Sequence, residues 1–484
     1  MIPSGRVPGY RGGYADAGPG GPGSVGDWGA VSTQWASAAT GANLEAARLQ
    51  MGVSLGWHIV LACFGVGMPA ITLLAEWRGH RTGDTAYRLL ARRWARAMGV
   101  LFAVGAVSGT ILSFEMGLLW PGMMGTYGEV IGLPFAIEGI AFFIEAIFLG
   151  LYLYAWDRMP PGRHLLTGIP IVIAGTSSAL FVVSTNAWMQ QPTGFDLANG
   201  RIVDVRPWAA MFNGSTPSQS VHMILAAFMV AGFTMASVYA VAMLRGRRDR
   251  YHRLGFLLPF TVAVVIAPIQ IVVGDWSAHH VGSSQPIKLA AMEGLFETER
   301  GVALHLGGIA VDGELRYSAE IPNALSLLAR WDANAEVIGL NSVPSSDRPP
   351  INTVHLAFQL MVVLGLALLA LVAWFALYWW RRRDLPRTPW FLRAASLAGI
   401  AALIALEAGW VVTEVGRQPW IVYEVLRTAD AVNPAPGLVW GFVLVAAVYL
   451  VLTVVSVYVL RRMVRDKPVP IAPQERDVTD FTVV

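Results

Sequence analysis

Cysteine and charge are both scarce in this chain of 484 residues. Its one cysteine, Cys63, lies within an apolar run, so no internal disulfide can form. The CxxCH motif is absent, which excludes a covalently attached, c-type heme. Charged residues make up only 14% of the sequence and the formal net charge is +3, with the arginines in short blocks rather than in one patch. This pattern argues against nucleic acid as a partner.

The N-terminal segment lacks both a periodic apolar face and the apolar core of a signal peptide. It is rich in glycine and alanine, as in "GYRGGYADAGPGGPGSVGDW". We therefore expect residues 1–44 to be disordered. A start codon assigned too far upstream explains the same composition equally well.

Long apolar runs dominate the remainder, and the mean hydropathy is +0.52. A helix needs roughly 20 residues to cross about 30 Å of hydrocarbon. Runs of that length lie near 51–76, 97–118, 134–156, 167–186, 218–244, 254–275, 351–380, 391–412 and 439–460. The sequence thus predicts an all-α, polytopic membrane helix bundle of about nine transmembrane helices, a domain spanning 45–465, followed by a cytoplasmic tail at 466–484.

The arginine blocks predict the orientation of this bundle. They follow the odd-numbered runs, for example "RGRRDRYHR" after the fifth and "RRRDLPR" after the seventh, whereas the connection after the second run has no Lys or Arg. The positive-inside rule then places the N-terminus outside and the C-terminus inside. The longest connection, 276–350, lies outside, and its amphipathic "KLAAMEGLFETE" predicts a short helix in a functional loop.

Two histidines and a methionine lie within the apolar runs. His58 and His222 must each find a donor, an acceptor or a metal, and an interhelical hydrogen bond and a heme iron are equally good explanations. Met361 alone is typical of a packed core, but it lies at a depth comparable with His222. A His and Met pair would make a low-spin, electron-transfer heme. His355, earlier in the same run, is a rival ligand.

Carboxylates form a second set of candidates. Glu138 and Glu145 are seven residues apart, two helical turns, so both project from one face of the third span. Two acids on one face of a membrane helix favour a proton or cation route over a structural pair. Glu115, near the outer end of the second span, is equally well explained as solvated.

The segment "GWVVTEVGRQPW" at 409–420 ends the eighth span with Glu414, Arg417 and two tryptophans, Trp410 and Trp420. A carboxylate at the outer edge can serve as an axial ligand of a five-coordinate heme and leave the sixth position to oxygen. The candidate ligands and acids therefore converge on the outer side, which also carries the long loop.

These residues closely resemble subunit I of cytochrome bd-type quinol oxidases. The most specific element is "GW…E.GRQPW", and further matches are "RLQ" ten residues before His58, "FEMG..W", "AIEG" with "FFIEA", "YAWDR", "NAWMQ.P.G" and "QP.KLAA.E...ET". The resemblance covers about residues 45–465. It implies a quinol:oxygen oxidoreductase in the bacterial cytoplasmic (inner) membrane, with a homologous subunit II and a possible small accessory membrane subunit as partners.

The resemblance also implies the ligands of three hemes. His222 and Met361 would hold a low-spin heme b. His58 and Glu414 would each serve one of two high-spin hemes, a heme b and a heme d or a further heme b in its place.

Other candidates would act around these hemes. Lys288 and Glu293, in the outer loop, would take part in quinol oxidation. Arg417 would lie near a heme propionate, and Trp410 would belong to the same cofactor site. The resemblance leaves open whether the substrate is ubiquinol or menaquinol.

The implied reaction separates charge without a pump. Membrane quinol would be oxidised at the outer side, and its electrons would pass through the low-spin heme to the high-spin pair, where O2 is reduced to water. Protons would be taken from the cytoplasm past Glu145, with Glu138 near the high-spin hemes.

The chain departs from the family pattern at three points, the first being an outer loop without the long insertion seen in some relatives. Gln359 replaces an arginine that some members carry two residues before the ligand methionine, so we expect a lower potential for the low-spin heme. The two acids of the third span are seven residues apart, where other members have eight.

Two other classes of function are a proton-coupled transporter using Glu138, Glu145 and Arg417, and a heme-free structural partner in a respiratory complex.

Overall fold

The computed structural model describes residues 41–198, 201–386 and 388–465. Within these ranges nine helices are long and apolar enough to cross a membrane, which confirms the predicted polytopic bundle. They are α2 (Gly41–Thr82), α3 (Thr85–Leu119), α4 (Pro121–Tyr154), α5 (Pro161–Gln190), α7 (Thr216–Leu244), α8 (Arg250–Ser284), α11 (Ile351–Arg382), α12 (Pro389–Val415) and α14 (Leu438–Arg465).

The first of these helices begins earlier than the sequence predicted. Because α2 starts at Gly41, the expected disordered segment 1–44 is wrong for its last four residues, 41–44. Residues 1–40 and the predicted tail 466–484 lie outside the described residues.

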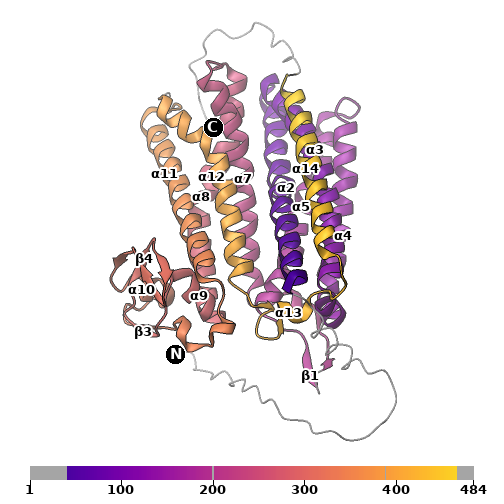
Figure 1. The fold of residues 1–484 in the computed structure, drawn as a ribbon. Coiled ribbons are helices and arrows are strands. Elements are labelled where there is room, and N and C mark those ends of the chain that lie inside the picture. The colour runs from indigo at the N-terminus through magenta and orange to yellow at the C-terminus, as the bar shows by residue number, and fades with distance from the viewer. Residues whose placement is uncertain (1–40, 199–200, 387, 466–484) are drawn as a thin grey trace, which may run out of the picture.

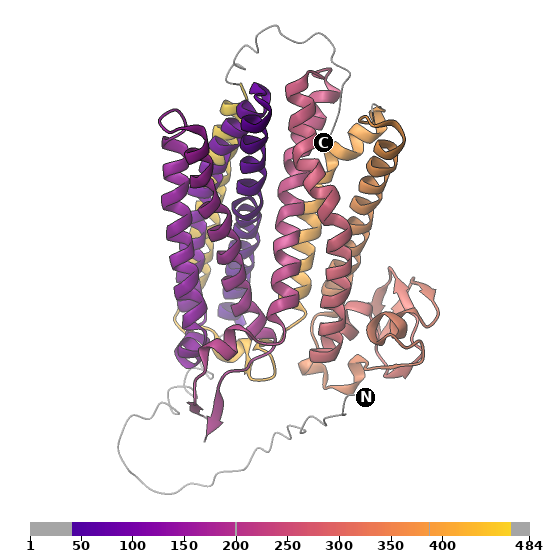
Figure 2. The ribbon, with the colours of Figure 1, turned by 180° about the vertical axis from the view of Figure 1, so that it is seen from behind.

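The long helices form two groups that stand side by side (Figures 1 and 2). One group contains α2, α3, α4, α5 and α14, and the other contains α7, α8, α11 and α12. Helix α7 packs against both α2 and α5 and so joins the groups, while α12 packs between α7 and α11. Side chains from different helices therefore face one another within each group and also where α7 contacts α2 and α5.

Side chains cap the helices at the end where the arginines gather. The Asp84 carboxylate accepts a hydrogen bond of 2.8 Å from the backbone N–H of Ala86 at the start of α3, and Asp249 does the same for His252 at the start of α8. Such caps satisfy N–H groups that a helix leaves without intrahelical partners. They fix where the chain turns back into the bundle.

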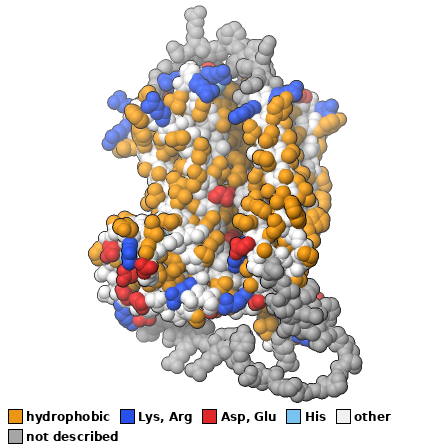
Figure 3. Space-filling view, viewed as in Figure 1, with side chains coloured by type: hydrophobic (Ala, Val, Ile, Leu, Met, Phe, Trp, Pro, Cys, Tyr) orange, Lys and Arg blue, Asp and Glu red, His pale blue; other side chains and the backbone are white. Residues whose placement is uncertain are grey.

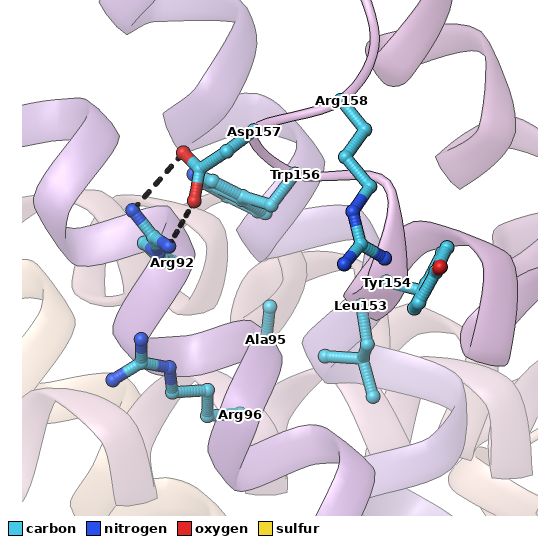
Figure 4. A pocket seen from close by; sticks show the side chains of 8 residues that line it. All are labelled: Arg92, Ala95, Arg96, Leu153, Tyr154, Trp156, Asp157 and Arg158. Atoms are coloured by element: carbon cyan, nitrogen blue, oxygen red, sulfur yellow. Dashed lines mark hydrogen bonds and ion pairs between the residues drawn. The ribbon is translucent and has the colours of Figure 1, made fainter.

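The two ends of the bundle differ in charge. Figure 3 shows a broad hydrophobic belt below a rim of Lys and Arg side chains at one end. A cavity of about 390 Å³ opens at this arginine-rich end between α3 and the end of α4 (Figure 4). Within it Arg92 pairs with Asp157, and the Arg158 guanidinium lies 3.6 Å from the centre of the Tyr154 ring.

The opposite end carries the small elements. Those of the long connection are α9 (Pro286–Glu293), α10 (Ala324–Arg330), two short 3-10 helices, η1 (Leu340–Ser342) and η2 (Ser345–Asp347), and three antiparallel strand pairs: β3 (Glu299–Arg300) with β8 (Glu336–Val337), β4 (Leu304–Leu306) with β7 (Ala319–Ile321), and β5 (Ile309–Val311) with β6 (Glu314–Arg316). The others at this end are β1 (Asp196–Ala198), β2 (Arg201–Val203), α6 (Pro207–Met211), β9 (Trp420–Val422), β10 (Leu426–Arg427) and α13 (Thr428–Ala431).

Helix α9 is the short amphipathic helix that the sequence predicted, but it ends before the amphipathic segment "KLAAMEGLFETE" does. Gly294, with φ of 69°, adopts the left-handed conformation and ends the helix after Glu293. The buried face of α9 packs against Val354 and Val412, on α11 and α12. The long connection is therefore a folded lobe anchored to the bundle.

Candidate functional site

The lobe places a buried lysine against the end of α12. Lys288 is 4% exposed, and its Nζ donates hydrogen bonds to Gln190 Oε1 at 2.5 Å and to the Thr413 carbonyl at 3.3 Å. A Cβ built on Gly416 would lie 3.1 Å from Lys288 Cγ, so glycine at this position leaves room for the lysine side chain. Burial, and secondarily the nearby Arg417, lowers the pKa of Lys288 to about 7, against a smaller opposing effect of Glu414.

A buried acid lies at the other end of α9. Glu293 is 4% exposed, and burial raises its pKa to about 8. Its Oε2 has no hydrogen-bond partner in the described part of the chain. A buried carboxyl group with a free oxygen can accept a proton from a bound molecule.

Glu414 and Arg417 form an ion pair beside Lys288. The Arg417 Nη2 donates to Glu414 Oε2 at 2.6 Å, and Asn186 of α5 donates to the other carboxylate oxygen. Arg417 is 2% exposed, and its Nε and Nη1 have no partners among the described residues. Burial lowers the pKa of Arg417 while Glu414 opposes this shift. Two unsatisfied N–H groups on a buried guanidinium fit an anionic ligand such as a heme propionate.

The surroundings of His58 fix its tautomer. Its Nδ1 lies 2.8 Å from Ser108 Oγ, and that hydroxyl donates its own proton to the Gly105 carbonyl at 2.9 Å. Ser108 Oγ must therefore accept from His58 Nδ1–H, which leaves the lone pair of Nε2 free for a metal. A Cβ built on Gly109 would lie 3.0 Å from His58 Cε1, so glycine keeps space open beside the ring.

His222 and Met361 also face glycines. A Cβ on Gly274 of α8 would lie 3.5 Å from His222 Cε1, and a Cβ on Gly409 of α12 would lie 3.1 Å from Met361 Sδ. Gln270 Nε2 lies 3.3 Å from both ring nitrogens of His222. Glycines opposite each side chain leave room for a flat macrocycle, so these residues fit heme, whose porphyrin itself supplies four nitrogens.

The rival ligand His355 is already engaged. It is fully buried, and its Nδ1 and Nε2 lie 2.8 and 3.1 Å from the carbonyls of Met292 and Gly307. It therefore ties the lobe to α11. Gln359 has a similar part, because its Nε2 donates to the His305 carbonyl and its Oε1 accepts from the Gly307 N–H.

The four candidate ligands lie on four different helices: His58 on α2, His222 on α7, Met361 on α11 and Glu414 on α12. Trp410, also on α12, is half-buried and packs against the main hydrophobic core. Across the described residues, no three His, Cys, Asp or Glu side chains are grouped closely enough to hold a metal ion by themselves.

Glu138 and Glu145 share one face of α4, as their spacing predicted, and this face is turned toward α5. Ser178 Oγ donates to Glu138 Oε1 at 3.1 Å. A Cβ on Gly175 would lie 3.4 Å from Glu145 Oε1, and one on Gly65 of α2 would lie 3.7 Å from it. Glu145 is buried between glycines, which leave space around its carboxyl group.

Several polar residues of the interior were missed or misjudged from the sequence. Glu115 is 2% exposed and accepts a 2.9 Å hydrogen bond from Gln50, so the solvated interpretation is wrong. Glu407, two turns before Glu414 on α12, faces Gly56 of α2, and its Oε1 has no hydrogen-bond partner among the residues that the structure describes. The seven-residue spacing that singled out Glu138 and Glu145 also marks Glu407.

Comparisons with known proteins agree with this geometry. The family model described as cytochrome bd terminal oxidase subunit I matches residues 46–468. A Bacillus subtilis (strain 168) protein whose name assigns it provisionally as a cytochrome bd menaquinol oxidase subunit I is 38% identical over 88% of this chain and 98% of its own length. The cytochrome bd ubiquinol oxidase subunit 1 of the same organism is 30% identical over 87% of this chain and 93% of its own length.

A solved structure extends the likeness to the fold. The bd oxidase from Geobacillus thermodenitrificans superposes with a TM-score of 0.83 at 39% identity, covering 88% of this chain and 99% of the matched chain. The transporter and heme-free alternatives are thereby set aside, and the prediction of a quinol oxidase subunit is confirmed. The chain is a multi-pass membrane protein that belongs to the family of cytochrome bd terminal oxidase subunit I.

Proposed function

We propose that this chain is the heme-binding, quinol-oxidising subunit of its oxidase. His222 and Met361 would hold a low-spin heme b, and His58 and Glu414 would each hold a high-spin heme, one of them a heme b and the other a heme d or a second heme b. When bound, these hemes would supply one-electron transfer and the iron at which O2 is reduced to water. The free Nε2 of His58 and the glycines facing three of the ligands support the assignment.

The observation that carries the proposal is the burial of Lys288 beside the Glu414–Arg417 ion pair, with the buried Glu293 at the other end of the same short helix. An ammonium group has three N–H donors, and two of those on Lys288 are used by Gln190 and Thr413. The third would orient a quinol oxygen. Glu293, with its free oxygen, would accept a proton as the quinol is oxidised and release it at this end of the bundle.

Arg417 would stabilise the site electrostatically. Its Nη2 holds Glu414 in place, and its free Nε and Nη1 would bind a heme propionate. Trp410, one turn before Glu414, would complete the same wall of the cofactor site.

Protons for water formation would come from the other end. We assign the arginine-rich end to the cytoplasm and the lobe to the outer side of the bacterial cytoplasmic membrane. Glu145 would pass protons from the arginine-rich end toward the high-spin hemes, with Glu138 further along the same helix face and nearer to those hemes. Release and uptake on opposite sides would generate a proton motive force without pumping.

The partners follow from the same proposal. Subunit I works with a subunit II, and exposed apolar side chains along α4 and α14 offer surface for that partner, for a small accessory subunit or for lipid. The names of the relatives differ between menaquinol and ubiquinol, so the proposed substrate is a membrane quinol as a class.

The reaction is tested with the complete oxidase purified with its second subunit. Oxygen consumption is measured with reduced ubiquinone and menaquinone analogues. Quinol-dependent consumption by heme-loaded enzyme is expected, and its absence with both analogues would contradict the proposal.

The orientation is tested separately through the exposed lobe. Tyr317 is 89% exposed, and the native chain offers only a buried cysteine as background. A Tyr317→Cys variant should react with a membrane-impermeant maleimide added outside intact spheroplasts, whereas Arg247→Cys, at the arginine-rich end, should react only after the membrane is opened. The reverse pattern would invert the assignment.

A further inference from the structure

A second polar cluster, not foreseen from the sequence, lies at the arginine-rich end of α2, α4 and α5. Glu76 of α2 and His164 of α5 are 2% and 3% exposed, and His164 Nδ1 lies 2.6 Å from Glu76 Oε1. The Tyr152 hydroxyl of α4 donates to Glu76 Oε2 at 2.5 Å. His80 Nε2, one turn along α2, lies 3.3 Å from Glu76 Oε1.

The hydrogen bonds of His164 determine how protons can be placed in this cluster. Its Nε2 lies 2.9 Å from the backbone carbonyl of Tyr152, which can only accept, so Nε2 carries a hydrogen. One proton then remains between Nδ1 and the Glu76 carboxylate, and it can belong to either group. If that proton leaves, a lone pair of His164 faces an anionic oxygen, an arrangement that strongly favours uptake of another proton.

The cluster has a route to bulk water. His80 lies in the last turn of α2, and its side chain is 24% exposed. It therefore reaches from solvent at the arginine-rich end to Glu76. The charged groups around this mouth include Asp157, near His164, and Arg92, which pairs with Asp157.

The cluster is aligned with Glu145 on all three helices. On α4, Tyr152 is seven residues after Glu145, two turns on the same face, or about 10 Å along the axis. On α2, Thr72 is one turn before Glu76 and seven residues after Gly65, which faces Glu145. On α5, His164 is eleven residues, about three turns, before Gly175, which also faces Glu145.

Thr72 provides independent support for bound water between Glu76 and Glu145. It is 1% exposed, and its Oγ1 has no hydrogen-bond partner in the part of the chain that the structure describes. A buried hydroxyl normally finds a partner, and ordered water commonly fills this role. Water bound at Thr72 would stand between Glu76 and the glycine-lined space around Glu145.

We propose that Glu76 and His164 form the proton-loading pair at the cytoplasmic entrance of the route to Glu145. This inference rests on the proposed function, since it deepens the proton uptake assigned there. A proton enters through His80, is held between Glu76 and His164, and passes by water at Thr72 to the Glu145 carboxylate. The pair is then reloaded from bulk water, so that each proton consumed at the oxygen site is replaced from the same side.

A purely structural tie is the competing explanation, because the cluster also links α2, α4 and α5. A tie needs hydrogen bonds but no transferable proton, and it has no need of the exposed His80 or of an unpartnered hydroxyl one turn away. The two explanations differ in how turnover responds to proton mobility.

The test uses the complete oxidase and compares Glu76→Gln, Glu76→Asp and Glu145→Gln. Heme content is read from the reduced spectrum, and quinol-driven oxygen consumption is measured in H2O and in D2O. Glu129→Gln, an exposed acid on α4, is the control and should behave as the native enzyme.

We expect Glu76→Gln to lower turnover about tenfold with hemes retained, a smaller loss than the factor of about 10²–10⁴ typical of a group that acts on the substrate itself, because Glu76 relays protons from a distance. Its solvent isotope effect should rise, and Glu76→Asp should recover much of the rate. Normal turnover and an unchanged isotope effect in Glu76→Gln, alongside slow turnover in Glu145→Gln, would overturn the loading pair alone. Normal turnover in both variants would remove the whole proton route.

A second variant covers the case in which Glu76→Gln does not assemble. His80→Gln changes a partly exposed side chain with one hydrogen bond inside the cluster, so assembly should persist. Slower turnover with a raised isotope effect supports the entrance. Native behaviour of a fully assembled His80→Gln enzyme would overturn it.

Discussion

Replacement of Lys288 by methionine tests the quinol site directly. Methionine has nearly the same length and keeps the packing of α9, but it removes a buried donor that contacts Gln190 and Thr413. A hydrogen bond from a charged group contributes about 1.5–3 kcal/mol, which corresponds to about a 10- to 150-fold loss in rate. Lys288→Met should therefore lower kcat/KM for quinol by about that factor while the heme spectra remain native.

The assay is oxygen consumption by the purified complex over a range of quinol concentrations. Arg300→Met is a matched control, since Arg300 is an exposed cation of the same lobe whose pairing with Glu336, at 3.6 Å, contributes little. An unchanged kcat/KM in Lys288→Met, with heme content intact, would refute the placement of quinol beside α9.

Three further predictions test other parts of the site. Met361→Leu conserves volume and should cost less than about 1.5 kcal/mol of stability, yet it should alter the low-spin reduced spectrum, and an unaltered spectrum would remove Met361 from the ligands. Burial raises the pKa of Glu293 to about 8 and lowers the pKa of Lys288 to about 7, so Glu293 gains its proton-accepting form while Lys288 loses its charge as the pH rises. The profile of kcat/KM for quinol against pH should therefore be bell-shaped, and Glu293→Gln should abolish the rise on its acid side; a rise that persists in Glu293→Gln would contradict this role. Gly109→Ala would put a Cβ 3.0 Å from His58 Cε1 and should disturb the heme bound by that histidine. A Cβ on Gly117 would meet nothing within 4 Å in the described residues beyond the backbone of its own helix, so Gly117→Ala should leave all hemes unchanged. Identical spectra for the two variants would contradict the assignment of His58.

The bundle could be predicted from the sequence because each span is a local property. A run of about 20 apolar residues must form a helix in lipid whatever its neighbours are. The same reasoning found Glu138 and Glu145, since helical spacing alone puts both on one face. It also found α9, although only the backbone conformation at Gly294 shows where that helix ends.

Contacts between distant segments could not be predicted in this way. Glu76 lies next to the arginine block that follows the first span, where an acid is usually solvated, and its burial depends on His164 and Tyr152, 88 and 76 residues further along the chain. His355 looked like a ligand because its two carbonyl partners belong to a lobe whose fold was unknown. Glu115 was ambiguous because Gln50, 65 residues away, is its partner.

The most direct test of the heme assignment is the dithionite-reduced minus air-oxidised visible spectrum of membranes that contain this chain and its partner subunit, recorded before and after carbon monoxide. We expect a low-spin b band together with a high-spin component that responds to carbon monoxide. A far-red chlorin band among the responding features would identify heme d, and its absence would identify a further heme b. A folded, correctly inserted protein with no heme signal would contradict the account.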